Sequence, residues 1–338
     1  MELQKRSLQV GAAALICALG LRLGGALSGP LTGFLCRPET VSALLFLETG
    51  RVVRTPSPQE PMTTMPVSEE TVPETTPTVE TTPPVVQAVF SPSDNNLIKI
   101  NDTAKVEPPV ETLLQQPLSW DLTGDEPTVL ILHTHGTESY VNSEGYDQSS
   151  LYHTYDADYN MISVGKALAD ALTAEGISVI HDTTPHDKAS YNDAYSNARA
   201  SMESYLAAYP SIQLVLDLHR DSVQDGNGQQ VAATVSTDAG ESARLMLVMG
   251  ADTGSGRHPD WEQNMALAVK LQAALERQCA GICRPIYVRS ERFNQDLSAG
   301  ALLIEVGSAG NTRQQALTAT QVLSRAILEL ANGAVYRQ

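Results

Sequence analysis

Residues 128–140 read Thr-Val-Leu-Ile-Leu-His-Thr-His-Gly-Thr-Glu-Ser-Tyr, and this stretch gives the clearest indication of the fold class. Its first six residues form a short apolar run with β-branched side chains, which predicts a buried strand from Thr128 to His133. Polar and chemically reactive side chains follow at once, so the strand leads into a loop that carries candidate site residues. A strand this apolar is expected to be covered on both of its faces.

Further apolar runs alternate with amphipathic segments along the rest of the chain. Strands are predicted at 177–181, 213–218, 285–289 and 301–306, and a hairpin from 231–235 and 244–249. Helical spacing of apolar side chains predicts helices over 161–172, 191–205, 261–275 and 312–330, the last opening with the capping box Thr312-x-x-Gln315. This alternation indicates a single α/β domain over residues 119–338, with a largely parallel, twisted sheet covered by helices.

The composition excludes several classes of function. Lys and Arg number 22 against 39 Asp and Glu, which gives a net charge of −17 and argues against nucleic acid as a partner. No Gly-rich phosphate loop follows the first strand, and no Gly-x-Ser-x-Gly elbow is present. A cysteine nucleophile is disfavoured because Cys279 and Cys283 have no histidine near them in the sequence, and both a disulfide and free thiols remain open for this pair.

Reactive side chains instead follow three of the predicted strands, whose carboxyl ends meet at one edge of a parallel sheet. His135-x-x-Glu138 follows the first, Asp217-Leu-His219-Arg-Asp221 ends the third, and Glu305 lies in the late strand. Two His and one Glu leave one tetrahedral position open, the pattern of a catalytic zinc site. We therefore predict Zn²⁺ on His135, Glu138 and His219. Glu305, flanked by apolar residues, is predicted to have a raised pKa and to serve as general base and acid.

Each of these residues also has a structural interpretation. His133 and His135 would share one face of a strand, and we favour His135 as the ligand, with His133 hydrogen-bonded beside the site. Asp217 could orient His219 or make an ordinary structural hydrogen bond. Arg220 and Asp221 could pair with each other or bind a substrate carboxylate. The remaining histidines receive no role, because such residues most often lie on the surface or cap helices: His153, His181, His186 and His258.

Two segments precede the α/β domain. Residues 1–35 contain an apolar run after Lys5 and Arg6, which predicts a single-pass membrane anchor with the rest of the chain outside the cytoplasm; a cleaved signal peptide is the alternative. Residues 36–118 are predicted to be a disordered juxtamembrane linker, since 55–84 is rich in Pro, Thr and Glu. The expected layout is an anchor, a spacer and a domain that works at a distance from the membrane.

The motifs of the α/β domain together resemble the stage II sporulation protein P family. They are Ile131-Leu-His-Thr-His-Gly-Thr-Glu-Ser-Tyr140, Ser163-Val-Gly-Lys-Ala-Leu168, His181-Asp-Thr-Thr-Pro-His-Asp187, Tyr191-Asn-Asp-Ala-Tyr195, Asp217-Leu-His-Arg-Asp221, Phe293-Asn-Gln-Asp-Leu297 and Leu303-Ile-Glu-Val-Gly307 with Asn311-Thr312. The likeness runs from about Pro127 to Leu330. Gly136 departs from the polar residue expected after His135 in relatives.

The resemblance implies a fold similar to zinc N-acetylmuramoyl-L-alanine amidases. It implies that His135, Glu138 and His219 hold zinc and that Glu305 is the catalytic acid and base. Asn294, Gln295 and Ser308, with His133, Asp217, Arg220 and Asp221, are then expected to bind substrate or to support the site. It further implies cleavage of peptidoglycan, both at the glycan–peptide amide and at peptide cross-links, during endospore engulfment at the septal or forespore membrane. Stage II sporulation proteins D and M are the implied partners.

The function expected from the sequence is therefore a membrane-anchored, zinc-dependent peptidoglycan amidase and endopeptidase. Two alternatives remain. One is a wall-binding scaffold without turnover, against which the four retained site residues argue. The other is a zinc carboxypeptidase-like enzyme on soluble peptides, against which the predicted tether argues.

Overall fold

The computed structural model describes residues 90–118, 121–141 and 152–332. The chain divides into residues 1–79 and 80–338, and every described residue belongs to the second unit. The predicted anchor and the Pro-rich part of the predicted linker lie outside the described residues. Within the described ranges, no helix combines the length and apolarity needed to cross a bilayer.

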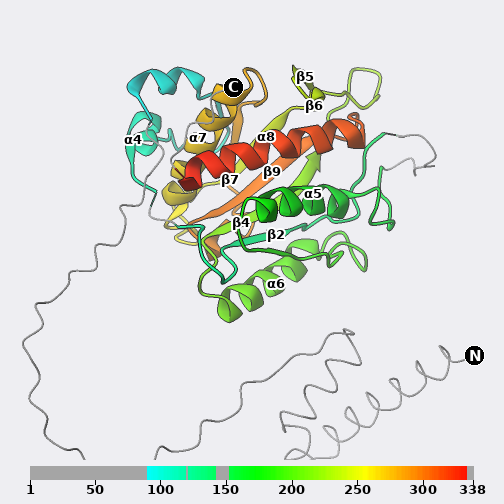
Figure 1. The fold of residues 1–338 in the computed structure, drawn as a ribbon, viewed down its shortest axis with the longest axis horizontal. Helices are drawn as coiled ribbons and strands as arrows, with labels where there is room; N and C mark the ends of the chain where they lie inside the picture. Colours follow the sequence, from blue (N-terminus) through cyan, green and yellow to red (C-terminus); the bar gives the residue numbers. More distant parts are fainter. Residues whose placement is uncertain (1–89, 119–120, 142–151, 333–338) are drawn as a thin grey trace, which may run out of the picture. The chain divides into compact units, whose positions relative to one another are not determined.

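A seven-stranded sheet forms the centre of the domain, in the order β1-β8-β7-β9-β4-β2-β3 (Figure 1). Its strands are β1 (Ile100–Asp102), β2 (Val129–Leu132), β3 (Val179–His181), β4 (Leu214–Asp221), β7 (Leu245–Gly250), β8 (Ile286–Arg289) and β9 (Ala301–Ser308). All neighbouring pairs are parallel except β7 and β9, which are antiparallel. The prediction of a largely parallel α/β sheet is confirmed, and β2, β3, β4 and β9 all end at the same edge.

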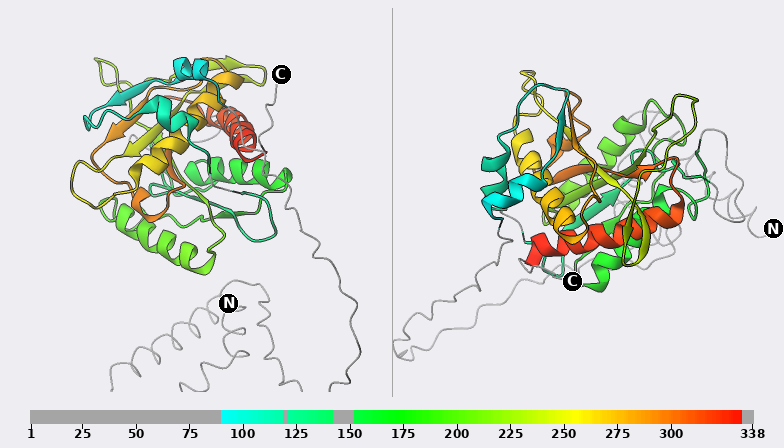
Figure 2. Two further views of the ribbon diagram at one scale, coloured as in Figure 1. Left: turned by 90° about the vertical axis from the view of Figure 1, so that its left-hand side faces the viewer. Right: turned by 90° about the horizontal axis from the view of Figure 1, so that it is seen from above.

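Four long helices flank this sheet: α5 (Met161–Ala174), α6 (Ala194–Ala208), α7 (Trp261–Gln278) and α8 (Arg313–Asn332). The apolar stripes of α5, α7 and α8 join the main core on one face, whereas Ala198 and Met202 of α6 pack on Leu130 and Leu132 from the other. Figures 1 and 2 show α6 separated from α5 and α8 by the sheet. The predicted capping box of α8 is present, since Thr312 and Gln315 exchange side-chain-to-backbone hydrogen bonds of 3.2 and 3.0 Å.

The predicted hairpin of 231–235 with 244–249 is wrong. The hairpin is formed by β5 (Thr234–Thr237) and β6 (Gly240–Ala243), which make a separate two-stranded sheet. Residues 245–250 are all buried and enter the large sheet as β7. The chain reverses at Gly240, whose φ of 113° is unfavourable for other residues. The mostly polar 234–237 strand stays near the surface, with Val235 partly buried against the core.

The predicted linker does not extend to residue 118. Residues 90–118 form a 3₁₀ helix, η1 (Pro92–Leu97), then β1 and a short helix, α4 (Val110–Gln115). β1 adds to the sheet edge beside β8, with Ile100 opposite Ile286. Leu113 and Leu114 of α4 are fully buried, and Asp94 pairs with Arg277 of α7. This segment is therefore part of the folded domain, and its short elements leave no periodic signal in the sequence.

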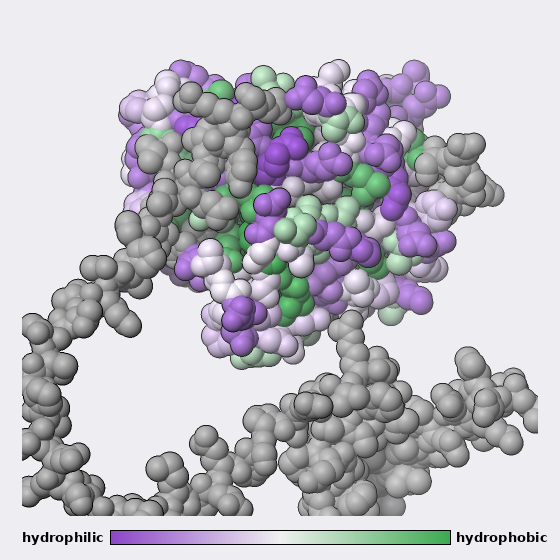
Figure 3. Space-filling view, viewed as in Figure 1, coloured by the Kyte–Doolittle hydropathy of each residue, from purple (hydrophilic) through white to green (hydrophobic). Residues whose placement is uncertain are grey.

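The face of the domain seen in Figure 3 carries mostly hydrophilic side chains with small, scattered apolar areas.

Candidate metal centre and its cleft

The predicted site residues meet at the edge of the sheet where β2, β4 and β9 end. β4 lies between the other two, with Asp217 opposite Leu132 of β2 and His219 opposite Glu305 of β9. His135 and Glu138 lie in the loop that follows β2. Together with His219 and Glu305 they line one cleft of about 460 Å³. The structure thus brings together the four residues to which the sequence assigns the chemistry.

Arg220 fixes the loop that carries Glu138. Its guanidinium donates to the carbonyls of Ser139 and Tyr152 at 3.0 and 2.9 Å, and it lies 3.4 Å from the Glu138 carboxylate. The backbone N–H of Arg220 donates to the same carboxylate at 3.2 Å. The ion pair suggested between Arg220 and Asp221 is therefore wrong. Neighbouring side chains of a strand point to opposite faces, and Asp221 pairs with Arg284 at 2.6 Å.

Two spacings among the predicted ligands are close to those of a tetrahedral metal site. Nδ1 of His219 lies 3.7 Å from Oε2 of Glu138, and the rings of His135 and His219 have centroids 5.4 Å apart. Zinc–nitrogen bonds of about 2.0–2.1 Å place two atoms on one tetrahedral ion about 3.4 Å apart and two imidazole centroids about 5 Å apart. Nδ1 of His135 is buried and has no hydrogen-bond partner. Among the described residues no group of three or more His, Cys, Asp or Glu side chains is arranged so that it could hold a metal ion, so the fit to zinc rests on the types of the donors and on these two spacings.

Asp217 is placed to orient His219. Its Oδ1 lies 3.0 Å from Nε2 of His219, and Thr134 holds the carboxylate through its backbone N–H at 2.8 Å and its hydroxyl at 2.6 Å. Burial alone would raise the pKa of Asp217, but His219 and the bonds from Thr134 outweigh it and lower that pKa. A permanently ionised carboxylate on the far nitrogen of a metal-binding histidine is a common supporting arrangement.

Glu305 differs from Glu138 in having no partner. Its side chain is half-buried, and its buried Oε2 makes no hydrogen bond with any described residue. Burial raises the pKa of Glu305 to about 8, with the neighbouring Glu138 carboxylate adding to the rise. The carboxyl group can therefore both accept and return a proton near neutral pH. The desolvation predicted from its apolar flanks is confirmed.

His133 lies away from the cleft, beneath α5. Its Nδ1–H donates to the carbonyl of Leu218 at 3.1 Å, and its Nε2 accepts from Nε2–H of His181 at 2.9 Å. Burial lowers the pKa of His133 to about 3, so the ring stays neutral. β2 ends at Leu132, so the strand alternation that would have put His133 and His135 on one side no longer holds. His133 supports the loop, as the structural interpretation expected.

Three further predicted residues hydrogen-bond to the backbone of other segments and do not line the metal cleft. Asn294 donates to the carbonyl of Tyr195 at 2.9 Å, and Gln295 bonds to Gly250 and Val248 at the end of β7, both at 2.8 Å. Ser308 donates to the carbonyl of Val231. None of the three lies against His135, Glu138 or His219 in the cleft.

Sequence reasoning missed three residues around His135. The ring of Tyr191 stacks on His135 with centroids 4.1 Å apart, and Tyr195 meets the same ring edge-on at 5.6 Å. Asp187 lies 4.0 Å from Nδ1 of His135 and accepts from the hydroxyl of Thr137 at 2.6 Å. The two tyrosines, four residues apart, stand out in the sequence only in a helical stripe and in a family motif, neither of which assigns them a role at the site.

The histidines without a predicted role are also not simply surface or capping residues. His186 and His258 are buried, and they bond to Asp182 and Asn264, both at 3.2 Å. His181 contacts His133, and His153 lies beside Thr137 at 3.1 Å. Cys279 and Cys283 are free thiols in the structure.

Residues 58–328 match the model of stage II sporulation protein P, which is most of the chain. The chain belongs to the stage II sporulation protein P family. Stage II sporulation protein P of Bacillus subtilis (strain 168) is 27% identical over 252 residues, an alignment that covers 69% of this chain and 57% of that relative. The chain thus spans little more than half the length of this family member.

Solved amidases show a weaker likeness to this chain. The N-acetylmuramoyl-L-alanine amidase AmiC2 of Nostoc punctiforme is 12% identical with a TM-score of 0.39, and the match covers 61% of this chain and 98% of that one. The catalytic domain of CwlV, an N-acetylmuramoyl-L-alanine amidase of Paenibacillus polymyxa var. colistinus, is 13% identical with a TM-score of 0.33, covering 60% of this chain and 97% of that one.

Proposed function

We propose that this chain is a zinc-dependent peptidoglycan hydrolase of sporulation that cleaves the N-acetylmuramoyl-L-alanine amide and peptide cross-links. The observation that carries the proposal is the meeting of His135, Glu138 and His219 in one cleft with Glu305, whose buried Oε2 has no hydrogen-bond partner among the described residues. Metal-assisted amide hydrolysis uses this combination, because water must be activated and the leaving nitrogen must be protonated.

Zinc held by His135, Glu138 and His219 supplies Lewis acidity, which polarises an amide carbonyl and makes water more acidic. The chain's own residues do the rest. Glu305 takes the proton of the attacking water and delivers it to the leaving amine, a double role that its raised pKa of about 8 permits. Asp217 orients His219, and Arg220 holds Glu138 in position. Tyr191 covers the His135 ring and narrows access for bulk water.

The cellular setting belongs to the same proposal. An N-terminal anchor in residues 1–35 and a spacer ending before residue 90 would place the domain outside the cytoplasm, facing the wall at the septal or forespore membrane. Stage II sporulation proteins D and M are the proposed partners. The net charge of −17 argues against capture by anionic wall polymers, so tethering and specific contacts would bring enzyme and substrate together.

Digestion of purified sacculi by the full-length chain, with and without a chelator, tests the proposal. We expect mass spectra to show free stem peptides and split cross-links, and we expect the chelator to abolish both until zinc is restored. Glu305→Gln should keep its zinc and lose cleavage. Sacculi left unchanged by the zinc-loaded chain, alone and with stage II sporulation protein D, would contradict the hydrolase and favour a wall-binding scaffold. Zinc lost from Glu305→Gln would instead make Glu305 a ligand.

A further inference from the structure

One face of the sheet beside Glu305 has no helix over it among the described residues. Met246 pairs with Glu305, and Val248 pairs with both Leu303 and Tyr287, so their side chains lie on the same face as that of Glu305. Met246, Val248 and Leu303 form a small apolar cluster apart from the main core, with Tyr287 and Phe293 packed against it. The helices α5, α7 and α8 join the core of the opposite face.

The residues of this apolar cluster are themselves buried, with Tyr287 and Phe293 packed against them, and they line the floor of a groove that begins at the metal cleft. The cleft shares Tyr195, Asp221 and Glu305 with a neighbouring cavity of about 410 Å³ over β9, β7 and β8. That cavity in turn shares Tyr195 and Phe293 with a third, of about 550 Å³. The cleft and the two cavities therefore adjoin one another, and Tyr195 borders all three. Crossing from β9 to β8 spans about 10 Å, which is the length of about three residues of an extended peptide.

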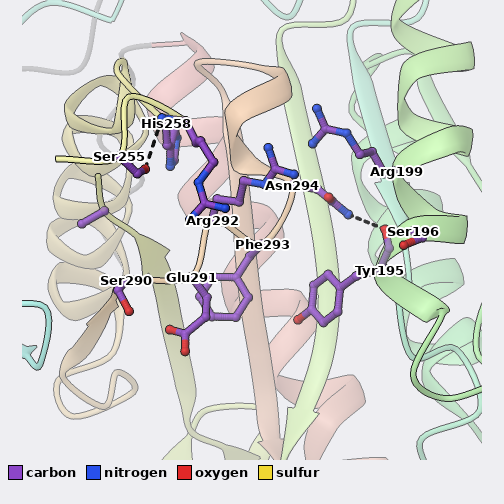
Figure 4. Close-up of a pocket in the computed structure, with 12 residues that line it drawn as sticks. Tyr195, Ser196, Arg199, Ser255, His258, Ser290, Glu291, Arg292, Phe293 and Asn294 are labelled. Carbon is purple, nitrogen blue, oxygen red and sulfur yellow. Dashed lines mark hydrogen bonds between the residues drawn. The ribbon is translucent and has the colours of Figure 1, made fainter. Parts of the chain in front are cut away.

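The far end of the groove is basic, although the chain as a whole is acidic. Arg199, Arg257 and Arg292 line the third cavity against a single acidic side chain, that of Glu291. Figure 4 shows Arg199 and Tyr195 projecting from α6 on one side and Arg292 and Phe293 from the loop after β8 on the other. Asp296 holds Arg199 and Arg292 in place at 3.0 and 3.1 Å.

Arg257 is the arginine left for a ligand. Its side chain is exposed, and no carboxylate within the described residues pairs with it. Arg292, 43% exposed, shares its single partner Asp296 with Arg199, so it also retains unused donors. Guanidinium groups with free donors at the end of an apolar groove fit a carboxylate carried on a short peptide.

We propose that the groove binds the peptide arm of the substrate in extended form, with Arg257 and Arg292 pairing with a free carboxylate of that peptide. This inference rests on the proposed function, because the peptide is the one attached to the scissile amide. The glycan fits this groove less well, since an uncharged sugar gives Arg257 and Arg292 no charge to pair with. The scissile bond then lies at Glu305, and the peptide runs over Met246 and Val248 towards the arginines.

Matched substrates provide the test. Two soluble disaccharide–peptide fragments are compared, one ending in a free carboxylate and the other in a carboxamide at the same position. We expect the full-length, zinc-loaded chain to prefer the carboxylate in kcat/KM, and expect Arg257→Gln and Arg292→Gln each to reduce that preference about tenfold. Lys166→Gln changes the charge equally at an exposed position on α5 and should preserve the preference.

Binding of the same two fragments to zinc-loaded Glu305→Gln, measured by calorimetry, tests the groove without turnover. Tighter binding of the carboxylate form that is lost in the Arg257→Gln, Glu305→Gln double variant supports the inference. If chains with an unaltered groove bind and cleave the two fragments equally, the inference about the groove is overturned, while the proposed hydrolase activity still stands. Failure of the proposed function looks different, because neither fragment is then cleaved whatever the binding shows.

Discussion

Arg220 binds the carboxylate of Glu138, a residue 82 positions earlier in the chain, through both its backbone N–H at 3.2 Å and its guanidinium at 3.4 Å. The same guanidinium donates to the carbonyls of Ser139 and Tyr152. One side chain therefore fixes both the position of a proposed zinc ligand and the backbone on each side of a loop.

Arg220→Gln should weaken zinc binding about 10–100-fold, because Glu138 loses its charged partner and the loop loses its anchor. Competition with a chromogenic chelator measures the affinity. Arg220→Lys keeps the charge but cannot reach the two carbonyls in the same way, and an intermediate loss is expected. Zinc affinity in Arg220→Gln equal to that of Lys166→Gln would show that Glu138 needs no such support.

Asp217→Asn should also weaken zinc binding, by about tenfold, with little loss of stability. The amide keeps the volume of the carboxylate, but it removes the negative charge that lies 3.0 Å from Nε2 of His219. Asp182→Asn is the matched control, since Asp182 is equally buried and bonds to Thr184 and His186 instead. Equal zinc affinities of the two variants would refute an orienting role for Asp217.

The sequence predicts which residues form the site, but it does not predict which side chains they contact. β2, β4 and β9 are apolar runs because they are central strands buried on both faces, and residues at their ends converge for topological reasons. The pairing of Arg220 with Glu138 could not be predicted from the ends of apolar runs, because Glu138 is remote in the sequence while Asp221 is adjacent to Arg220. The stacking of Tyr191 on His135 is likewise a tertiary contact that no local pattern encodes.

Gly165 permits the close approach of α5 to the pair His133–His181. A Cβ at this position would lie 2.3 Å from Nε2 of His133 and 2.7 Å from Nε2 of His181. Gly165→Ala should therefore lower the free energy of unfolding by about 1–3 kcal/mol, although alanine favours a helix. Urea unfolding with an unchanged m-value measures the loss. Gly226→Ala, where a Cβ meets nothing within 4 Å, should be close to neutral; equal midpoints for the two variants would disprove the clash.

Residues 90–118 should stabilise the domain by several kcal/mol. Removing them exposes the surfaces that bury Phe90, Leu113 and Leu114, and each large apolar side chain contributes about 1.5–3 kcal/mol. It also leaves β8 as an open sheet edge, which favours aggregation. Chains beginning at residue 90 and at residue 119 are compared by thermal unfolding and gel filtration. Identical melting temperatures would restore the linker boundary at residue 118 that the sequence predicts.

Lys270 of α7 makes the packing of residues 90–118 on the domain sensitive to pH. Its ammonium donates to the carbonyl of Leu114 and lies 5.2 Å from the centroid of the Phe90 ring, and burial lowers its pKa to about 8. Between pH 8 and 10.5 the unfolded chain keeps a proton that the folded chain has released, so stability rises with pH across this window. The rise should be on the order of 2 kcal/mol, measured as the difference between the unmodified chain and Lys270→Met in urea unfolding at pH 7 and pH 10. Lys166→Met, at an exposed lysine, should show the same pH dependence as the unmodified chain. A Lys270→Met chain that retains the full rise would show that Lys270 is not the group that titrates.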